Sequence, residues 1–471
     1  VCEEVLEGQY VYCSSSDMWY RCVDNVWRKE KKGLDITRVT MDAIEELLGR
    51  DSEHALLELS RQTTFLNGVV NMCRTFAAKH DFWAMLDTNP NLLPFDDQVL
   101  NLQTNTWTPL RPDMYISKTT GYPRPAPDED KQRYLLDRIH EMMPESVGGI
   151  EYLMAALATS LIGTNMFQTF YILYGPSAGN GKTTIFHLMA VALGKLSVKM
   201  QSNALTIDKR GQNEHDAMTQ AKGARFLYIE EPNAEAKIQS HFIKDKTGDG
   251  MVKSRAPYAQ EEVEFPAMFT FFMGCNFILR ATSLADAEMR RIRVILFGQK
   301  FRAEDDPDFT HGTLPKDPLL GMRAKTVEYG GQFLLILIDY WLKYKHLNSL
   351  ECLRHKAHRD ATQDYFDDVD PLAKHIRDTY EFTENQADRI MSEEILNEAR
   401  RAMNNDKLSQ RTVYGILRRR GCVVARVFKG PYYVAGIRIR PNIVDDDIVP
   451  DREEGGDAIA GGCGRIDSYF R

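Results

Sequence analysis

A glycine-rich turn between an apolar strand-like run and an apolar helix constrains this chain more than any other feature. The run covers residues 170–173, the helix covers residues 185–193, and the turn between them ends in lysine and threonine. Backbone N–H groups of such a turn, with the N-terminus of the following helix, form a pocket for polyphosphate. Lys182 would reach the β- and γ-phosphates, and the Thr183 hydroxyl would hold Mg²⁺. The predicted nucleotide-binding residues are Gly175, Gly179, Asn180, Gly181, Lys182, Thr183 and Thr184.

The start of this turn departs from the usual phosphate-loop pattern. Pro176 stands where the first glycine of the pattern is expected, and Gly175 lies one place further out. A chance glycine-rich turn is the alternative interpretation. The strand before the turn, the Gly-Lys-Thr within it and the helix after it favour a phosphate loop.

Two adjacent carboxylates end a second apolar run. Residues 226–229 lead directly into Glu230 and Glu231. Carboxylates at the C-terminal tip of a strand beside a phosphate loop can hold Mg²⁺ and polarise an attacking water. We assign Glu230 mainly to the metal and Glu231 mainly to the water. The alternative is a pair of solvated acids at a strand end.

Further polar residues follow these acids along the chain. The strand-like run 268–274 is followed by Asn276, whose amide could orient the water and sense the γ-phosphate, although Asn after a strand is often only a turn residue. Arg290 and Arg291 precede the apolar run 292–297. They are either surface charge or arginines supplied in trans to a neighbour's ATP.

These features follow one another in the order of a superfamily III helicase. Over residues 90–440 the chain resembles the primase-helicases of poxviruses and other large DNA viruses, which have relatives in phages. The matching motifs are Asn180-Gly181-Lys182, Glu231-Pro232, Thr247-Gly248-Asp249, Asn276 and Arg290-Arg291. The resemblance also covers residues 99–118, upstream of the motor.

This resemblance implies a function and a set of partners. It implies an α/β chain with an AAA+ type core that binds ATP and Mg²⁺, assembles as a homo-hexamer and unwinds DNA for viral or mobile-element replication. A hairpin over residues 251–260 would carry Lys253, Arg255 and Tyr258 to DNA. The ring would translocate on single-stranded DNA and act on forked DNA. Alternatives are an AAA+ ATPase for DNA packaging and an ATP-gated replisome scaffold without unwinding.

Composition limits the other possibilities. The net charge of −8 argues against a protein that coats nucleic acid over its whole surface, so DNA contacts are expected from local basic clusters. The eight cysteines form no C-x-x-C pair, which predicts free thiols in an intracellular reducing compartment. No apolar run reaches the ~20 residues that span a bilayer. We therefore expect no membrane partner. The resemblance implies a place in the host-cell cytoplasm, at the viral replication site.

Composition shifts suggest five regions. They are a mixed α/β N-terminal domain (1–125), a helical lead-in (126–164), the ATPase core (165–345), a winged-helix module (369–440) and a disordered acidic tail (443–471). Because the chain begins at Val1 rather than methionine, we expect it to be part of a longer chain, with a primase domain upstream.

The winged-helix module has a local excess of positive charge. A predicted helix over 409–420 precedes two strand-like runs, 423–428 and 432–439, and residues 401–440 hold ten Lys or Arg against one acid. This excess predicts a nucleic-acid contact through Arg418, Arg419 and Arg420, with a solvated basic face as the alternative.

The last residues carry a candidate docking peptide. Ile466, Tyr469 and Phe470 have the spacing of the short peptide that replication proteins insert into sliding clamps, although Cys463 stands where glutamine is usual. A segment that folds upon binding suits an acid-rich and glycine-rich tether. The alternative is a frayed C-terminus.

Overall fold

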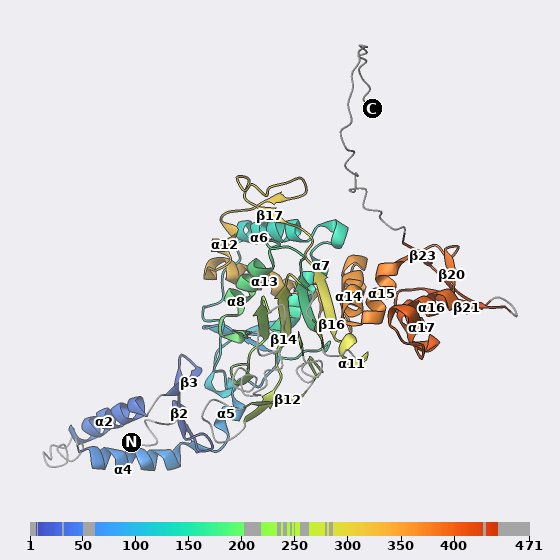
Figure 1. Cartoon of the computed structure of the whole chain (residues 1–471). Helices are drawn as coiled ribbons and strands as arrows, with labels where there is room; N and C mark the ends of the chain where they lie inside the picture. The colour runs from blue at the N-terminus through green and yellow to red at the C-terminus, as the bar shows by residue number, and fades with distance from the viewer. Residues whose placement is uncertain are drawn as a thin grey trace, which may run out of the picture. The chain divides into compact units, whose positions relative to one another are not determined.

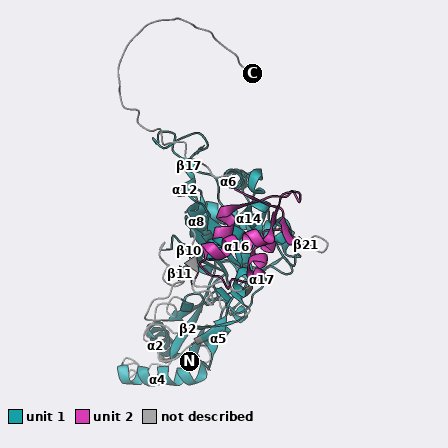
Figure 2. Ribbon diagram, turned by 45° about the vertical axis from the view of Figure 1, so that its right-hand side comes forward, with its two compact units in different colours: residues 1–374 teal, residues 375–471 magenta. Residues whose placement is uncertain are grey.

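The computed structural model describes most of the chain. Described are residues 6, 8–30, 33–49, 62–201, 218–232, 237–238, 243–244, 247–248, 250–254, 263–277, 280–281, 286–426 and 430–440. The chain divides into two compact units, residues 1–374 and residues 375–471 (Figure 2).

A small sheet and its helices open the first unit. The strands pair in the order β3-β2-β1-β4, and Trp19 and Trp27 from this sheet are buried as core residues. The elements are β1 (Tyr10–Cys13), β2 (Met18–Val23), β3 (Val26–Glu30), β4 (Ala78–Lys79), α2 (Leu34–Gly49), α4 (Thr63–Phe76) and α5 (Phe82–Met85). Burial of large aromatic side chains supplies much of the apolar area of so small a layer.

A three-stranded meander and two helices lead to the main sheet. The Asp128 side chain accepts a hydrogen bond from the backbone N–H of Lys131 and so caps the first of these helices. The elements are β5 (Leu92–Pro94), β6 (Gln98–Asn101), β7 (Thr106–Pro109), η1 (Pro112–Met114), α6 (Glu129–Met142), η2 (Glu145–Val147), α7 (Glu151–Ala158) and η3 (Thr159–Leu161). Helices α6 and α7, with the 3₁₀ turn η2 between them, therefore connect the meander to the main sheet.

A five-stranded parallel sheet forms the centre of the first unit (Figure 1). Its strands run in the order β16-β8-β14-β10-β9 and all neighbours pair in parallel. They are β8 (Phe170–Tyr174), β9 (Ser197–Lys199), β10 (Phe226–Glu230), β14 (Thr270–Cys275) and β16 (Ile292–Leu296). Nearly continuous apolar sequence in β8, β10 and β14 is typical of strands buried on both faces. The predicted α/β class is confirmed, and the structure adds that the central sheet is parallel.

Helices and short strand pairs surround this sheet. Helix α13 packs on α8, and α14 packs on β16. The elements are α8 (Lys182–Leu193), η4 (Gly194–Leu196), β11 (Lys237–Ile238), β12 (Met251–Ser254), β13 (Val263–Pro266), β15 (Arg280–Ala281), α11 (Asp286–Met289), β17 (Phe301–Arg302), β18 (Leu314–Pro315), α12 (Leu320–Arg323), α13 (Val327–Tyr344), η6 (Glu351–Leu353) and α14 (Lys356–Val369).

Side chains of helix α14 accept hydrogen bonds from backbone N–H groups on the open edge of β16. The backbone N–H of Val294 donates to the Thr362 hydroxyl at 2.9 Å, and that of Leu296 donates to Nδ1 of His358 at 3.1 Å. An exposed strand edge would offer unpaired N–H groups to other chains. Burial lowers the pKa of His358 to about 4, so this imidazole stays neutral and can accept the bond.

Buried cations fasten the N-terminal part of the first unit to the start of β10. The Arg225 guanidinium, 3% exposed, donates to the carbonyl oxygens of Asn89, Pro90 and Leu92 at 3.0–3.1 Å. The Lys222 ammonium donates to the carbonyl of Leu86 at 2.6 Å. The strand that ends in the two predicted catalytic acids is therefore anchored at its beginning.

The second unit contains a helix followed by a hairpin, as predicted. Its elements are β19 (Tyr380–Phe382), β20 (Arg389–Met391), α16 (Ser392–Ala402), α17 (Gln410–Arg419), β21 (Val423–Arg426), β22 (Tyr432–Ala435) and β23 (Ile437–Ile439), while α15 (Pro371–Thr379) crosses the boundary of the units. Strand β22 pairs with both β21 and β20.

One expectation for this unit is wrong. The run 432–439 is not one strand, because Gly436 adopts φ +80° and separates β22 from β23. Only glycine takes this conformation at little cost. Strand β23 then pairs with β19 instead of continuing the hairpin.

Candidate nucleotide-binding site

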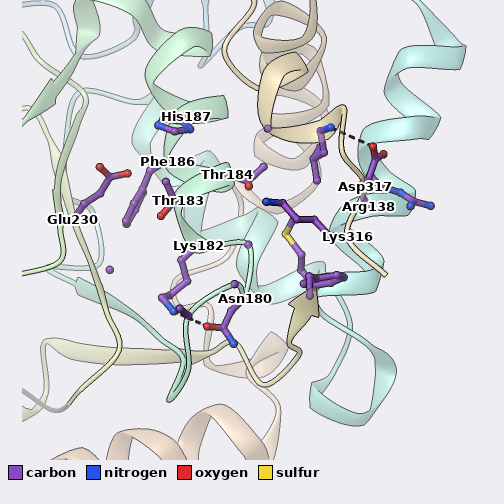
Figure 3. Close-up of a pocket in the computed structure, with 18 of the residues that line it drawn as sticks. Arg138, Asn180, Lys182, Thr183, Thr184, Phe186, His187, Glu230, Lys316 and Asp317 are labelled. Carbon is purple, nitrogen blue, oxygen red and sulfur yellow. Dashed lines mark hydrogen bonds between the residues drawn. The ribbon is translucent and has the colours of Figure 1, made fainter. Parts of the chain in front are cut away.

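A cavity of about 380 Å³ lies at the carboxyl-terminal edge of the parallel sheet (Figure 3). The phosphate-loop residues 178–184, the tips of β10 and β14, and residues of α6 line it. Every predicted nucleotide-binding residue except Gly175 lines this cavity, and so do Glu230, Glu231 and Asn276. The carboxyl edge of a parallel sheet is where such folds bind ligands. The structure therefore gathers these predicted residues in one place.

The glycines of the loop allow close approaches. Gly179 and Gly181 have φ of +78° and +91°, and a Cβ on Gly181 would lie 2.5 Å from Sδ of Met142. Gly175 donates its N–H to the Cys275 carbonyl at 3.2 Å, and a Cβ on it would lie 2.8 Å from Nζ of Lys182. The displaced first glycine therefore lets the end of β8 lie against both β14 and the lysine.

Lys182 links the loop to β14. Its ammonium donates to Oδ1 of Asn276 at 2.7 Å and to Oδ1 of Asn180 at 3.0 Å (Figure 3 marks the second). The Asn180 amide in turn donates to the carbonyl of Gln299 at 2.7 Å. Burial lowers the pKa of Lys182, and the charge of Glu231 opposes this shift. Among the described residues this ammonium donates only to neutral amide and carbonyl oxygens, so it is well suited to donate to phosphate oxygens instead.

The two acids differ in their surroundings. Glu230 ends β10 with its side chain 14% exposed, its Oε2 pairs with the Lys199 ammonium, and its Oε1 is buried without a hydrogen-bond partner among the described residues. Glu231 is exposed and adopts φ +47°, held by a 3.0 Å hydrogen bond from its N–H to the Gly274 carbonyl. A non-glycine residue in this region is strained, and such strain is concentrated at functional sites.

These residues fit Mg²⁺ and a nucleotide polyphosphate. The unpartnered Oε1 of Glu230 is a carboxylate oxygen that can accept a metal, and Thr183 and Thr184 line the cavity in the first turn of α8. Mg²⁺ is usually held by one or two carboxylates together with phosphate oxygens and waters. The helix N-terminus adds backbone N–H groups for the phosphates.

Several lining residues were missed by the sequence analysis. They are Arg138, Glu141, Met142, Phe186, His187, Phe301, Lys316, Asp317, Leu320 and Lys325. Burial raises the pKa of Asp317, but a 2.6 Å hydrogen bond from the Tyr134 hydroxyl and two from backbone N–H groups lower it overall. Of these residues only Phe186 and His187 lie near the loop in sequence. His187 follows Thr183 by four residues, so the two lie on the same face of the helix, and this spacing could have predicted His187 as a lining residue.

The arginines before β16 lie elsewhere. Arg291 is 6% exposed and donates to the Ala287 carbonyl at 2.7 Å and to Oε1 of Gln168 at 3.1 Å, while Arg290 is exposed. Both line a second cavity of about 350 Å³, together with Arg293. Neither lines the nucleotide cavity of its own chain.

The predicted DNA-contacting residues are partly described. Lys253 lies exposed on β12, opposite Glu264 of β13 in an antiparallel pair, whereas Arg255 and Tyr258 lie outside the described residues. Arg418 and Arg419 are exposed at the end of α17. The Arg420 guanidinium lies over the Phe382 ring at 5.3 Å. The clamp-binding residues Ile466, Tyr469 and Phe470 also lie outside the described residues.

Parts of this chain are similar in sequence to known proteins. Residues 3–143 match the family model described as "D5 N terminal like". A protein called a putative helicase, from Acanthamoeba polyphaga mimivirus, is 30% identical over 65% of this chain and 33% of its own length. A putative helicase of Invertebrate iridescent virus 3 is 24% identical over 72% of this chain and 38% of its own length. A putative primase of African swine fever virus is 22% identical over the same shares.

These matches confirm the predicted relationship to the primase-helicases of large DNA viruses. The chain spans about a third of the length of these relatives (33–38%). The apo structure of the NrS-1 C-terminal region aligns with 91% of this chain and 96% of its own, at 9% identity and a TM-score of 0.46. In the described part of the chain, no helix has the length and apolar character needed to cross a membrane.

Proposed function

We propose that this chain is the motor of a viral replication helicase, an AAA+ type ATPase of superfamily III that unwinds DNA as a homo-hexamer. The observation that carries the proposal is the contact between Lys182 and Asn276 in the lining of a cavity that Glu230 and Glu231 also line. A lysine, a polar amide and two acids around a glycine-rich loop are the parts that ATP hydrolysis requires.

The residues of the cavity have separate tasks. The loop N–H groups and Lys182 would hold the β- and γ-phosphates of ATP, while Thr183 and Glu230 would hold Mg²⁺. When bound there, Mg²⁺ would supply positive charge against the phosphates. Glu231 orients the attacking water, and Asn276 senses whether the γ-phosphate is present, because it contacts the same ammonium that the phosphate would engage.

Hydrolysis is proposed to require a second copy of the chain. Arg290 is exposed, remote from its own nucleotide cavity, and makes no hydrogen bond or ion pair within the described residues. It is therefore available to contact a neighbouring subunit, where an arginine in trans would stabilise transition-state charge at that subunit's ATP. Arg291 has two hydrogen bonds inside its own chain and is the less suitable of the two.

DNA is proposed to contact two basic elements. The β12–β13 hairpin presents Lys253 and is the element that would enter the ring channel. We assign the α17 helix and the β21–β22 hairpin to a winged helix, in which Arg418 and Arg419 would contact phosphates. The ring would translocate on single-stranded DNA from a forked substrate, at the viral replication site in the host-cell cytoplasm.

A packaging ATPase and an ATP-gated scaffold are the alternatives. A steady-state ATPase assay separates the scaffold, because a scaffold does not turn ATP over. Displacement of a labelled strand from a forked duplex separates the packaging enzyme. We expect ATP-dependent displacement that Lys182→Ala abolishes. DNA-stimulated ATP hydrolysis without displacement of the strand would contradict the helicase proposal.

A further inference from the structure

The carboxylate that is proposed to bind Mg²⁺ already holds a cation of the protein. The Lys199 ammonium forms a salt bridge with Oε2 of Glu230. Lys199 ends β9 and stands beside Tyr228 in the parallel register with β10. Because alternate residues of a strand face the same side, Tyr228 and Glu230 share a face, and Lys199 reaches diagonally to the acid. Phe186 of α8 packs on Tyr228, with ring centres 5.2 Å apart, and so covers this face.

The two members of this pair are unequally exposed. The Glu230 side chain is 14% exposed and the Lys199 side chain is 55% exposed. A buried carboxylate is costly without a cation, whereas a lysine head on a flexible stem returns to water easily. Glu230 lines the nucleotide cavity with Oε1 unpartnered, and Lys199 does not line it. The acid is therefore fixed in place, and the cation can leave.

We propose that Lys199 is a stand-in cation, which occupies Glu230 until Mg²⁺ arrives with the nucleotide and displaces it. This inference rests on the proposed ATPase function. Mg²⁺ on Oε1 and an ammonium on Oε2 would be a few ångströms apart and would repel each other strongly in a partly buried site. The lysine thus opposes binding of metal alone, and the negative phosphates of ATP supply the attraction that completes the exchange.

The test measures the Mg²⁺ requirement of nucleotide binding rather than turnover. A fluorescent ATP analogue is titrated with this chain, residues 1–471, at graded Mg²⁺ concentrations. For Lys199→Met we expect half-maximal binding at about five-fold less Mg²⁺, the factor expected when a pair with one exposed member is removed. Lys199→Arg keeps a cation that can donate two hydrogen bonds to the Glu230 carboxylate, so this variant should need at least as much Mg²⁺ as the parent.

A matched control separates the pair from net charge. Lys195 is exposed four residues earlier in the chain, so Lys195→Met removes the same charge without touching Glu230 and should leave the Mg²⁺ requirement unchanged. Thermal unfolding gives a second readout. Without metal and nucleotide, Lys199→Met should unfold at a lower temperature than the parent, because Glu230 is left unpaired, and Mg²⁺ with nucleotide should remove this difference.

The outcomes distinguish this inference from the function on which it rests. If Lys199→Met binds the analogue with an unchanged or increased Mg²⁺ requirement, the stand-in role is wrong while the nucleotide site stands. An increased requirement would mean that Lys199 orients the carboxylate for the metal. If the parent protein binds no analogue at any Mg²⁺ concentration, the proposed ATPase function fails and the inference fails with it.

Discussion

Loss of Arg290 and loss of Arg291 should have opposite consequences, although the two residues are adjacent. Arg291 is buried, and its guanidinium makes two hydrogen bonds, to Ala287 and Gln168. Arg291→Ala leaves both acceptors without this donor, and an unsatisfied buried group costs about 1–3 kcal/mol. Because the neighbouring cavity can admit water, we expect a total loss of about 2–3 kcal/mol. The entropy of unfolding is about 2.1 cal/mol/K per residue, so for the unit of residues 1–374 this loss corresponds to a fall in Tm of roughly 3–4 °C.

Arg290→Ala should instead leave stability within about 0.5 kcal/mol of the parent, since the side chain is exposed and makes no bond among the described residues. Its nucleotide affinity should also stay unchanged, because Arg290 does not line the cavity. ATP hydrolysis should fall by about 10³-fold or more, as expected for removal of an arginine supplied in trans.

Mixed assemblies supply the decisive assay. Arg290→Ala subunits are mixed with Lys182→Ala subunits, and ATP hydrolysis is measured at a fixed total concentration. Some interfaces then pair an intact Lys182 with an intact Arg290, so hydrolysis should partly recover. Mixing Lys182→Ala with Glu231→Gln is the matched control, because both lesions lie in one subunit's own cavity and no interface is repaired.

Three results would refute this reasoning. Recovery in the control mixture would show that the cavity itself is shared between subunits. Absence of recovery with Arg290→Ala would count against a site completed in trans. A large loss of stability in Arg290→Ala, with a normal melting temperature in Arg291→Ala, would mean that the structural assignment of the two side chains is reversed.

The remaining predictions concern individual side chains and the C-terminal segment. Lys182→Ala should abolish ATP hydrolysis, and Glu231→Gln should bind ATP at parental affinity without turnover; near-parental turnover in Glu231→Gln would remove Glu231 from its role on water. Lys253→Ala should lower unwinding more than ATP hydrolysis and reduce the salt slope of DNA binding by about 1, and unchanged unwinding would exclude the hairpin from the mechanism. Burial lowers the folded-state pKa of His358 to about 4, so the unfolded chain binds more protons than the folded chain between pH 6.5 and 4. The free energy of unfolding should therefore fall as the pH drops through this window, by up to about 3 kcal/mol. His358→Asn should flatten the pH dependence of chemical denaturation there, and an unaltered slope would contradict a buried neutral imidazole. A fluorescent peptide of residues 460–471 should bind a sliding clamp from the same replication system, and binding that survives alanine at both aromatic residues would end that hypothesis.

Local motifs of this chain could be recognised from the sequence. The phosphate loop is a strand, a turn and a helix within 24 residues, 170–193, and its backbone conformation depends on glycines inside the turn. Strand β10, which ends at Glu230, and strand β14, which ends just before Asn276, are short apolar runs, and such runs predict buried strands. The helix before the β21–β22 hairpin is also recognisable, because its apolar residues recur with the period of a helix over a few turns.

Only the tertiary structure decided which of these pieces meet and which side chains are buried. Asn276 contacts a lysine 94 residues earlier, and Lys199 pairs with an acid 31 residues later. Arg290 and Arg291 have the same chemistry and neighbouring positions, yet one is exposed and the other is buried. Strand order, helix packing and burial depend on segments far apart in the chain, and no local pattern carries that information.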